Sequence, residues 1–315
     1  MVCKSQLGST TAKMTFKVGR HEILIRGQPT EVLSLGQSLN ESPENIILII
    51  PGNPGLASFY IDFMQTIYSS LKETHSIWAI SHAGHCHTSH ISAWPDSNNV
   101  YNLEEQINHK IAFIQDHIPQ QAKVTLIGHS IGCQIILRLL QYFDSKSEVT
   151  IVKSFLLFPT VERLRNTPNG QRFWPMLCYL RWLVIFLTAC LYVLPVKVRE
   201  KMLLWFFKGR QVPDCSIQAT IQLFQPKVMQ NVLWMAYHEL LQVHEADTEA
   251  IDKHKDKIVL YYGAMDGWCP RIYRDELKLK VEGVNAILCE DGYQHAFVLE
   301  YSEPMGQKIV EWVRS

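Results

Sequence analysis

The sequence predicts an α/β fold with a mainly parallel central sheet, flanked by helices and carrying an inserted, apolar helical cap. Short apolar runs that end at Gly or Pro alternate with segments of helical periodicity, which is typical of βαβ units and a parallel sheet. The interval between the predicted strands at 152–158 and 257–263 breaks this alternation, because it reads as helical and holds the most apolar stretch of the chain. We therefore expect residues 1–160 and 250–315 to form the core and 161–249 to form the cap.

Strands are expected where apolar runs stop at turn residues. The run at 46–50 ends at Pro51 and Gly52, which favours a strand buried on both faces. The other predicted strands lie at 13–26, 30–35, 76–81, 123–128, 152–158, 257–263 and 285–290. Helices are expected between them, with Ser58 and Asn102 as N-caps. The predicted helices lie at 58–73, 102–118, 134–143 and 303–314.

Composition narrows the class of protein. The 315 residues are 47% hydrophobic and 19% charged, which indicates a folded chain and not a disordered one. A net charge of zero gives no reason to expect a nucleic-acid partner. The N-terminus lacks the apolar core of a signal peptide, so a cytosol-facing protein is expected. No CxxC pair occurs among the cysteines, which predicts reduced thiols without a disulfide framework or zinc site: Cys3, Cys86, Cys133, Cys178, Cys190, Cys215, Cys269 and Cys289.

The stretch "KVTLIGHSIGCQIILRLL" places Ser130 between a predicted strand and a predicted helix. In that context Gly-x-Ser-x-Gly is typical of a nucleophile elbow, a sharp turn that lifts the serine hydroxyl above the sheet. Gly128 and Gly132 would provide the clearance, because a β-carbon there would collide with the neighbouring backbone. An ordinary turn serine is the alternative, and the strand–turn–helix context disfavours it.

A neutral serine needs a base that is oriented by a carboxylate. Asp266 follows the strand at 257–263 and His295 follows the last strand, so both fall at the sheet edge where they can converge on Ser130. Glu162 is an alternative acid one strand earlier. Asp291 is a weaker alternative, because it is close in sequence to His295 and suits a turn.

Acyl transfer also needs donors for the oxyanion, usually two backbone N–H groups. One is expected from Ile131, the residue after the nucleophile, and the other from the loop "PGNPG". Pro54 has no N–H group, so Asn53 is the candidate in that loop. A plain tight turn is the alternative for this Pro- and Gly-rich segment.

Histidines gather after the strand at 76–81 and raise the question of a metal. Their spacing matches no known zinc pattern and carboxylate partners are missing nearby, so we expect neither a metal nor another cofactor. The residues are His82, His85, His87 and His90.

The motifs "PGNPG", "GHSIG", "GAMDGW" and "GYQHAF" occur in an order that resembles the α/β-hydrolase superfamily across nearly the whole chain. The "PGNPG…FY" opening with "GHSIG" and a very apolar cap looks specifically like the lipid-droplet-associated serine hydrolases. That resemblance implies a serine-hydrolase fold, location on lipid droplets and the endoplasmic reticulum, and a sterol ester or other neutral lipid as substrate.

Residues 173–207 predict a lipid-surface-binding segment independently of this resemblance. The uncharged core, 182–196, is fifteen residues long, and a helix of that length spans about 22 Å, less than the roughly 30 Å of membrane hydrocarbon. A monotopic hairpin or interfacial helix is therefore favoured over a transmembrane span. Residues 163–213 hold nine basic residues and one acidic residue, which suits an anionic lipid surface. The expected anchors are Trp174, Trp182 and Trp205. A cap helix buried against the core is the alternative.

The sequence thus predicts a cytosol-facing serine esterase or lipase that binds a lipid monolayer and cleaves a hydrophobic ester. Two alternatives stay open. One is a weakly active or inactive hydrolase-fold protein that coats or tethers droplets. The other is an acyltransferase or thioesterase that uses the same Ser-His-Asp triad.

Overall fold

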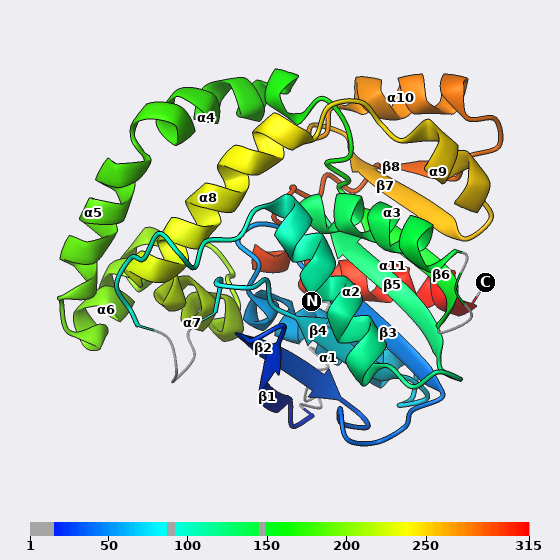
Figure 1. The fold of residues 1–315 in the computed structure, drawn as a ribbon, viewed down its shortest axis with the longest axis horizontal. Helices are drawn as coiled ribbons and strands as arrows, with labels where there is room; N and C mark the ends of the chain where they lie inside the picture. The colour runs from blue at the N-terminus through cyan, green and yellow to red at the C-terminus, as the bar shows by residue number, and fades with distance from the viewer. Residues whose placement is uncertain (1–15, 87–91, 145, 147–148, 315) are drawn as a thin grey trace, which may run out of the picture.

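The computed structural model describes residues 16–86, 92–144, 146 and 149–314. It confirms the predicted α/β fold: an eight-stranded sheet has the order β1-β2-β4-β3-β5-β6-β7-β8 (Figure 1). The six strands from β4 to β8 in this order run parallel, while β2 pairs antiparallel with both β1 and β4. The strands are β1 (Gly19–Ile25), β2 (Gln28–Leu35), β3 (Asn45–Ile50), β4 (Ser76–Ile80), β5 (Lys123–His129), β6 (Thr150–Leu157), β7 (Ile258–Gly263) and β8 (Ala286–Cys289).

Helices cover both faces of the sheet, as expected for a parallel sheet whose strands are buried on both sides. Helices α2 (Leu103–His117) and α3 (Ile131–Phe143) lie on one face, and α1 (Ile61–Ser70) and α11 (Ser302–Arg314) pack together on the other (Figure 1). The central strands β3 and β5 are almost wholly buried between these layers. Helices α9 (Thr248–His254) and α10 (Arg271–Lys280) flank the β7–β8 end of the sheet.

The two predicted N-caps have different outcomes. Asn102 caps α2 as predicted, with its side chain accepting from the Glu105 N–H and the Glu105 carboxylate accepting from the Asn102 N–H. The prediction for Ser58 was wrong. A 3₁₀ turn, η1 (Ala57–Tyr60), precedes α1, and the buried Ser58 hydroxyl donates instead to Glu31 at 3.2 Å. The side chain of Ser58 therefore binds Glu31 of β2 and caps no helix.

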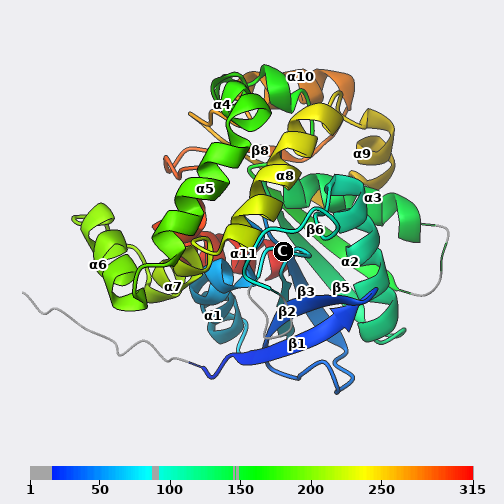
Figure 2. The same cartoon turned by 60° about the vertical axis from the view of Figure 1, so that its left-hand side comes forward.

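Five helices connect β6 to α9 and form the helical insertion: α4 (Pro168–Tyr179), α5 (Arg181–Tyr192), α6 (Val196–Phe206), α7 (Asp214–Gln222) and α8 (Pro226–Gln242). Figure 2 shows α6 at the outer edge of the molecule and α8 between α5 and the sheet. In the described part of the chain no single helix is long and apolar enough to cross a membrane. The pair α4 and α5 meets the length and composition criteria only jointly, and it is bent by 79°.

Candidate active site

Ser130 lies between the end of β5 and the start of α3, where the backbone makes a sharp turn. Its φ of 54° and ψ of −121° are unusual for a residue with a side chain, so the turn is strained. Both flanking glycines are in close contact: a β-carbon on Gly132 would lie 2.3 Å from the Ile50 carbonyl oxygen, and one on Gly128 would lie 2.9 Å from the Cys133 nitrogen. The turn can therefore form only if these two positions lack a side chain.

The structure brings Ser130, His295 and Asp266 together in one hydrogen-bonded chain. The Ser130 hydroxyl lies 2.9 Å from His295 Nε2, and His295 Nδ1 lies 2.7 Å from Asp266 Oδ2. Asp266 follows β7 and His295 follows β8, so the carboxyl ends of three parallel strands supply the group. In the neutral state of the imidazole, Nδ1–H donates to the carboxylate and Nε2 accepts from the hydroxyl. This is the arrangement in which a serine proton can be transferred to histidine.

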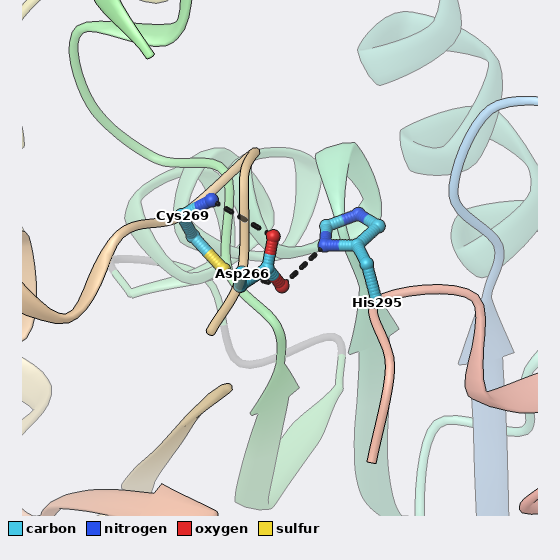
Figure 3. A group of neighbouring side chains, drawn as sticks. All are labelled: Asp266, Cys269 and His295. Atoms are coloured by element: carbon cyan, nitrogen blue, oxygen red, sulfur yellow. Dashed lines mark hydrogen bonds and ion pairs between the residues drawn. The ribbon is translucent and has the colours of Figure 1, made fainter. Parts of the chain in front are cut away.

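The carboxylate of Asp266 is held by three further donors. Oδ1 accepts from the Trp268 N–H at 2.7 Å. Cys269, which lies beside the carboxylate in Figure 3, donates to Oδ1 through its N–H at 3.2 Å and to Oδ2 through its thiol at 3.2 Å. Burial alone would raise the pKa of Asp266, but the charge of His295 and these hydrogen bonds keep it below the usual value. Asp266 is therefore ionised and able to orient the imidazole at neutral pH.

Asp266, Cys269 and His295 are also close enough together to share a metal ion (Figure 3). The chemistry of these donors does not fit one. The Cys269 thiol donates to Asp266 Oδ2 at 3.2 Å, so that carboxylate oxygen is already bonded within the group. His295 Nδ1 already donates to Asp266 and has no lone pair available in that tautomer.

The two alternative acids are engaged elsewhere. Glu162 is buried, and its carboxylate pairs with the Arg163 guanidinium at 2.7 Å. The same guanidinium also pairs with Glu276. Asp291 is exposed and pairs with Lys308 at 3.1 Å. Among the sequence candidates, only Asp266 has its carboxylate on the His295 imidazole.

The loop "PGNPG" lies against the nucleophile turn. A β-carbon on Gly52 would lie 3.0 Å from the Ser130 β-carbon, so this glycine permits the close approach. Asn53 and Ser130 line the same pocket. Ile131 is the first residue of α3, and the first N–H groups of a helix have no carbonyl partner within it. Asn53 therefore shares the pocket with Ser130, and Ile131 follows Ser130 directly in the chain; their roles as oxyanion donors stay predictions.

His129 has a structural position that excludes it as the base. His129 Nε2 lies 2.8 Å from the carbonyl oxygen of His295. A carbonyl oxygen can only accept a hydrogen bond, so Nε2 carries the hydrogen and donates it. Its Nδ1 then accepts from the Tyr60 hydroxyl at 2.7 Å, and Tyr60 Oη in turn accepts from the Gly52 N–H at 2.9 Å. Burial lowers the pKa of His129 to about 3, so the ring stays neutral. This chain of hydrogen bonds joins the "PGNPG" loop to the backbone of His295.

The histidines after β4 serve the same loop. The His85 Nδ1 accepts from the Gly55 N–H at 2.9 Å, and the His82 ring packs against Gly55 so closely that no β-carbon fits there. Burial lowers the pKa of His82 and His85 well below the usual value, so both rings are neutral. His87 and His90 lie outside the described residues.

A mainly apolar pocket of about 200 Å³ opens beside the Ser130 hydroxyl. Its apolar walls come from η1, from the loop after β7 and from η3 (Phe297–Leu299), and include Phe59, Trp268, Val298 and Leu299. The only strongly polar side chains of this lining are Ser130, His295, His129, Asn53 and Tyr60. Such a site suits a substrate with an apolar body and one reacting polar group.

Comparison with known proteins identifies the family that this chain matches. Residues 43–298 match the family described as lipid-droplet associated hydrolase. The lipid droplet-associated hydrolase of Gallus gallus is 36% identical over 302 residues, covering 91% of this chain and 92% of that protein. The human protein of the same name is 34% identical over 307 residues, covering 92% and 93%.

This chain belongs to the lipid-droplet-associated hydrolase family. Solved structures place the family fold among α/β-hydrolases. An esterase from Exiguobacterium antarcticum has a TM-score of 0.63 at 16% identity and covers 93% of this chain and 98% of its own. A haloalkane dehalogenase from Agrobacterium tumefaciens has a TM-score of 0.66 at 15% identity, with coverages of 94% and 96%. At these identities the likeness establishes the fold alone.

The three tryptophans predicted as lipid anchors do not share one environment. Trp182 on α5 and Trp205 on α6 are 67% and 77% exposed. Trp174 on α4 instead stacks on Tyr237 of α8 at 5.8 Å, with the Arg165 guanidinium 3.8 Å over its ring. Trp174 is half-buried, and its role as a lipid anchor stays a prediction.

Helices α5 and α6 expose further large apolar side chains beside these two tryptophans. We call this surface the α5–α6 apolar face. It comprises Trp182, Phe186, Leu187, Val196, Val198, Met202, Leu204, Trp205 and Phe206. The exposed Lys197 and Lys201 of α6 lie among them in the sequence.

Sequence reasoning missed several residues around the site in this hydrolase. Tyr60 could have been found, because it follows "PGNPG" closely and its hydroxyl needs a partner once buried. Cys269 gave a weak signal, since it lies in the loop after β7 with Asp266. Glu239 on α8 gave none: its carboxylate accepts from the Asn53 side chain across 186 positions of sequence.

Proposed function

We propose that this family member is a serine hydrolase that cleaves a hydrophobic carboxylic ester, such as a sterol ester or other neutral lipid. The observation that carries the proposal is the unbroken chain from the Ser130 hydroxyl through His295 to the Asp266 carboxylate. Ser130 Oγ attacks the ester carbonyl while its proton moves to His295 Nε2. The ester's carbonyl oxygen then carries the negative charge, which the N–H groups of Asn53 and Ile131 stabilise.

The acyl-enzyme forms when this intermediate collapses. The C–O bond to the alcohol breaks, and His295 returns its proton to the departing oxygen. A water molecule then attacks the acyl carbonyl, gives its proton to His295, and releases the acid as Ser130 regains its hydrogen. Asp266 holds the imidazole tautomer in both halves of the reaction and stabilises the imidazolium that forms.

Attachment to a lipid monolayer is part of the proposal, supported by the α5–α6 apolar face and by the net charge of +8 over residues 163–213. Exposed apolar surface of this extent is unusual on a protein that stays in water. Helix α6 packs on α7, and Ser216 of α7 donates to the carbonyl of Val298, which lines the catalytic pocket. Helix α7 thus links the α5–α6 apolar face to a segment that lines the pocket, and we infer that a lipid ester from a droplet surface or the endoplasmic reticulum enters from this side.

The experiment is to treat the full chain with a fluorophosphonate probe and to assay a panel of lipid esters. We expect wild type to label and Ser130→Ala to lose labelling and ester cleavage together. Absence of labelling in wild type would favour a droplet coat or tethering protein instead. Equal labelling of Ser130→Ala would place the reactive serine elsewhere.

Product analysis separates the hydrolase from an acyltransferase or thioesterase. Free acid should be the main product in water even when sterol or glycerol acceptors are supplied, and oxygen esters should be cleaved in preference to thioesters. Acyl transfer to the acceptor as the main outcome would overturn the hydrolase assignment while leaving the triad in place.

A further inference from the structure

The side chain of Asn53 is held from the helical insertion. Its Nδ2 amide donates to the Val232 carbonyl oxygen at 3.0 Å and to the Glu239 carboxyl Oε1 at 3.0 Å. Both acceptors belong to α8, about two turns apart on one helix. The rest of the "PGNPG" loop is bound by the core, through Tyr60 on Gly52 and His85 on Gly55. Asn53 is thus the point at which the insertion holds this loop.

The two acceptors on α8 fix the orientation of the Asn53 amide. Each of the two Nδ2 hydrogens has one acceptor, which uses the full donor capacity of the group. A flipped amide would place Oδ1 against the Val232 carbonyl oxygen, and two acceptors would then face each other. The backbone N–H of the same residue is the proposed oxyanion donor, so fixing this side chain also restricts the peptide that must point at the oxyanion.

Burying the carboxyl group of Glu239 costs desolvation free energy, which is unfavourable unless the group has a role such as holding Asn53. It is 7% exposed, and among the ion pairs of the described residues it has none. Burial raises the pKa of Glu239 to about 7, and the Asn53 hydrogen bond offsets part of that rise. Asn53 is the one side chain that contributes to this shift, and its amide is the hydrogen-bond partner of the buried carboxyl. A leucine at this position would avoid the desolvation cost.

We propose that Glu239 is a positioning residue for the oxyanion hole, acting through the Asn53 side chain. This inference rests on the proposed serine-hydrolase function. It makes the insertion a part of the catalytic apparatus, because one of its helices determines where an oxyanion donor points. An acceptor at position 239 is required, and a negative charge is not.

The test measures full-length Glu239→Leu, Glu239→Gln, Asn53→Ala and the double variant Glu239→Leu/Asn53→Ala. The readouts are the rate of fluorophosphonate labelling, and kcat and KM on p-nitrophenyl butyrate. Loss of an oxyanion donor lowers kcat by about 10²- to 10³-fold; a misdirected donor should lower it by about tenfold, with KM within about twofold. Glu239→Gln keeps an acceptor and should stay within about twofold of wild type. Leu240→Ala, also buried on α8, is the control for general destabilisation.

The double variant separates positioning from a purely structural role. If Glu239 acts through Asn53, the double variant should be no slower than the slower single variant, because the second change removes nothing further. Normal kcat in Glu239→Leu, or equal losses in Glu239→Leu and Leu240→Ala, would overturn the inference while the serine hydrolase stands. No labelling of wild type would overturn the hydrolase and the inference together. If Glu239→Leu does not fold, normal kcat in Asn53→Ala still refutes the inference.

Discussion

Helices α3 and α5 have similar lengths and similarly apolar sequences, yet the protein uses them in opposite ways. In α3, "IGCQIILRLLQYF" has its apolar side chains buried between the sheet and α2. In α5, "RWLVIFLTACLY" buries only Thr188 fully and exposes Trp182, Phe186 and Leu187. The core follows the ordinary rule that apolar side chains leave water, whereas α5 and α6 of the insertion expose many large apolar side chains.

The contrast indicates that apolar side chains have different roles in the core and in the insertion. In the core, tight packing holds a strained serine and its two partners at fixed distances. In the insertion, exposed aromatic and aliphatic groups are available to a second apolar phase.

Asp266→Asn should have the largest effect, because it removes the charge that orients and stabilises the His295 imidazole while leaving the core packed. We expect kcat for ester cleavage to fall by about 10³- to 10⁴-fold with little change in thermal stability. Asp291→Asn makes the same chemical change on an exposed carboxylate and should leave kcat unchanged. Equal losses in the two variants would contradict the assignment of Asp266.

Leucine-to-alanine changes test the two helices directly. Leu139→Ala in α3 empties a fully buried position and should lower the free energy of unfolding by about 2 to 5 kcal/mol. Leu187→Ala in α5 changes a side chain that is 53% exposed and should stay within about 0.5 kcal/mol of wild type. Urea denaturation of both variants measures the difference. Similar losses would mean that α5 is covered by protein in solution.

The α5–α6 apolar face should control lipid binding. The triple variant Trp182→Ser/Phe186→Ser/Trp205→Ser should bind about 100-fold more weakly to triolein droplets coated with phosphatidylcholine and phosphatidylserine, measured by flotation. Fluorophosphonate labelling in solution should be retained.

The control is a double variant, Leu24→Ser/Leu279→Ser, which changes two exposed leucines of the core, at 67% and 88% exposure. It should float like wild type. Equal loss in both variants would show that lipid binding follows total apolar exposure and has no dedicated face.

The smallest effect concerns the pH dependence of stability. The folded-state pKa of Glu239 is raised to about 7, so the folded protein binds a proton that the unfolded chain has already lost. Stability should therefore fall as pH rises, by about 2 kcal/mol between pH 5 and pH 7. Glu239→Gln should lack this decline when thermal unfolding is followed across that range. A parallel decline in the variant would assign it to another group.

The predictions that succeeded are those in which a short stretch of sequence determines its own local structure. Asn102 caps α2 because the residue that completes its capping box lies three positions away. The order of the motifs placed Ser130, Asp266 and His295 after β5, β7 and β8, and parallel strands end at the same sheet edge. Their catalytic roles stay predictions until the variants are measured.

The predictions that failed concern residues whose structure depends on contacts with residues elsewhere in the sequence. Ser58 has the residue type of a cap, but Glu31 of β2 binds its hydroxyl. The stacking of Trp174 on Tyr237 of α8 was likewise invisible in the local sequence, and its role as a lipid anchor stays a prediction. The choice between Asp266 and Glu162 was open until the structure showed Asp266 Oδ2 at 2.7 Å from His295 Nδ1.

By itself, the sequence determined the alternation of strands and helices, the strained turn at Ser130 and the presence of an apolar, basic insertion. These follow from residue periodicity and from steric limits that act over a few positions. Only the tertiary structure decided which apolar helix is buried, which carboxylate holds His295, and that Glu239 of the insertion binds Asn53. Those outcomes depend on contacts between segments that are not adjacent in the sequence, from 29 positions apart for Asp266 and His295 to 186 for Asn53 and Glu239, and no local pattern specifies the partner.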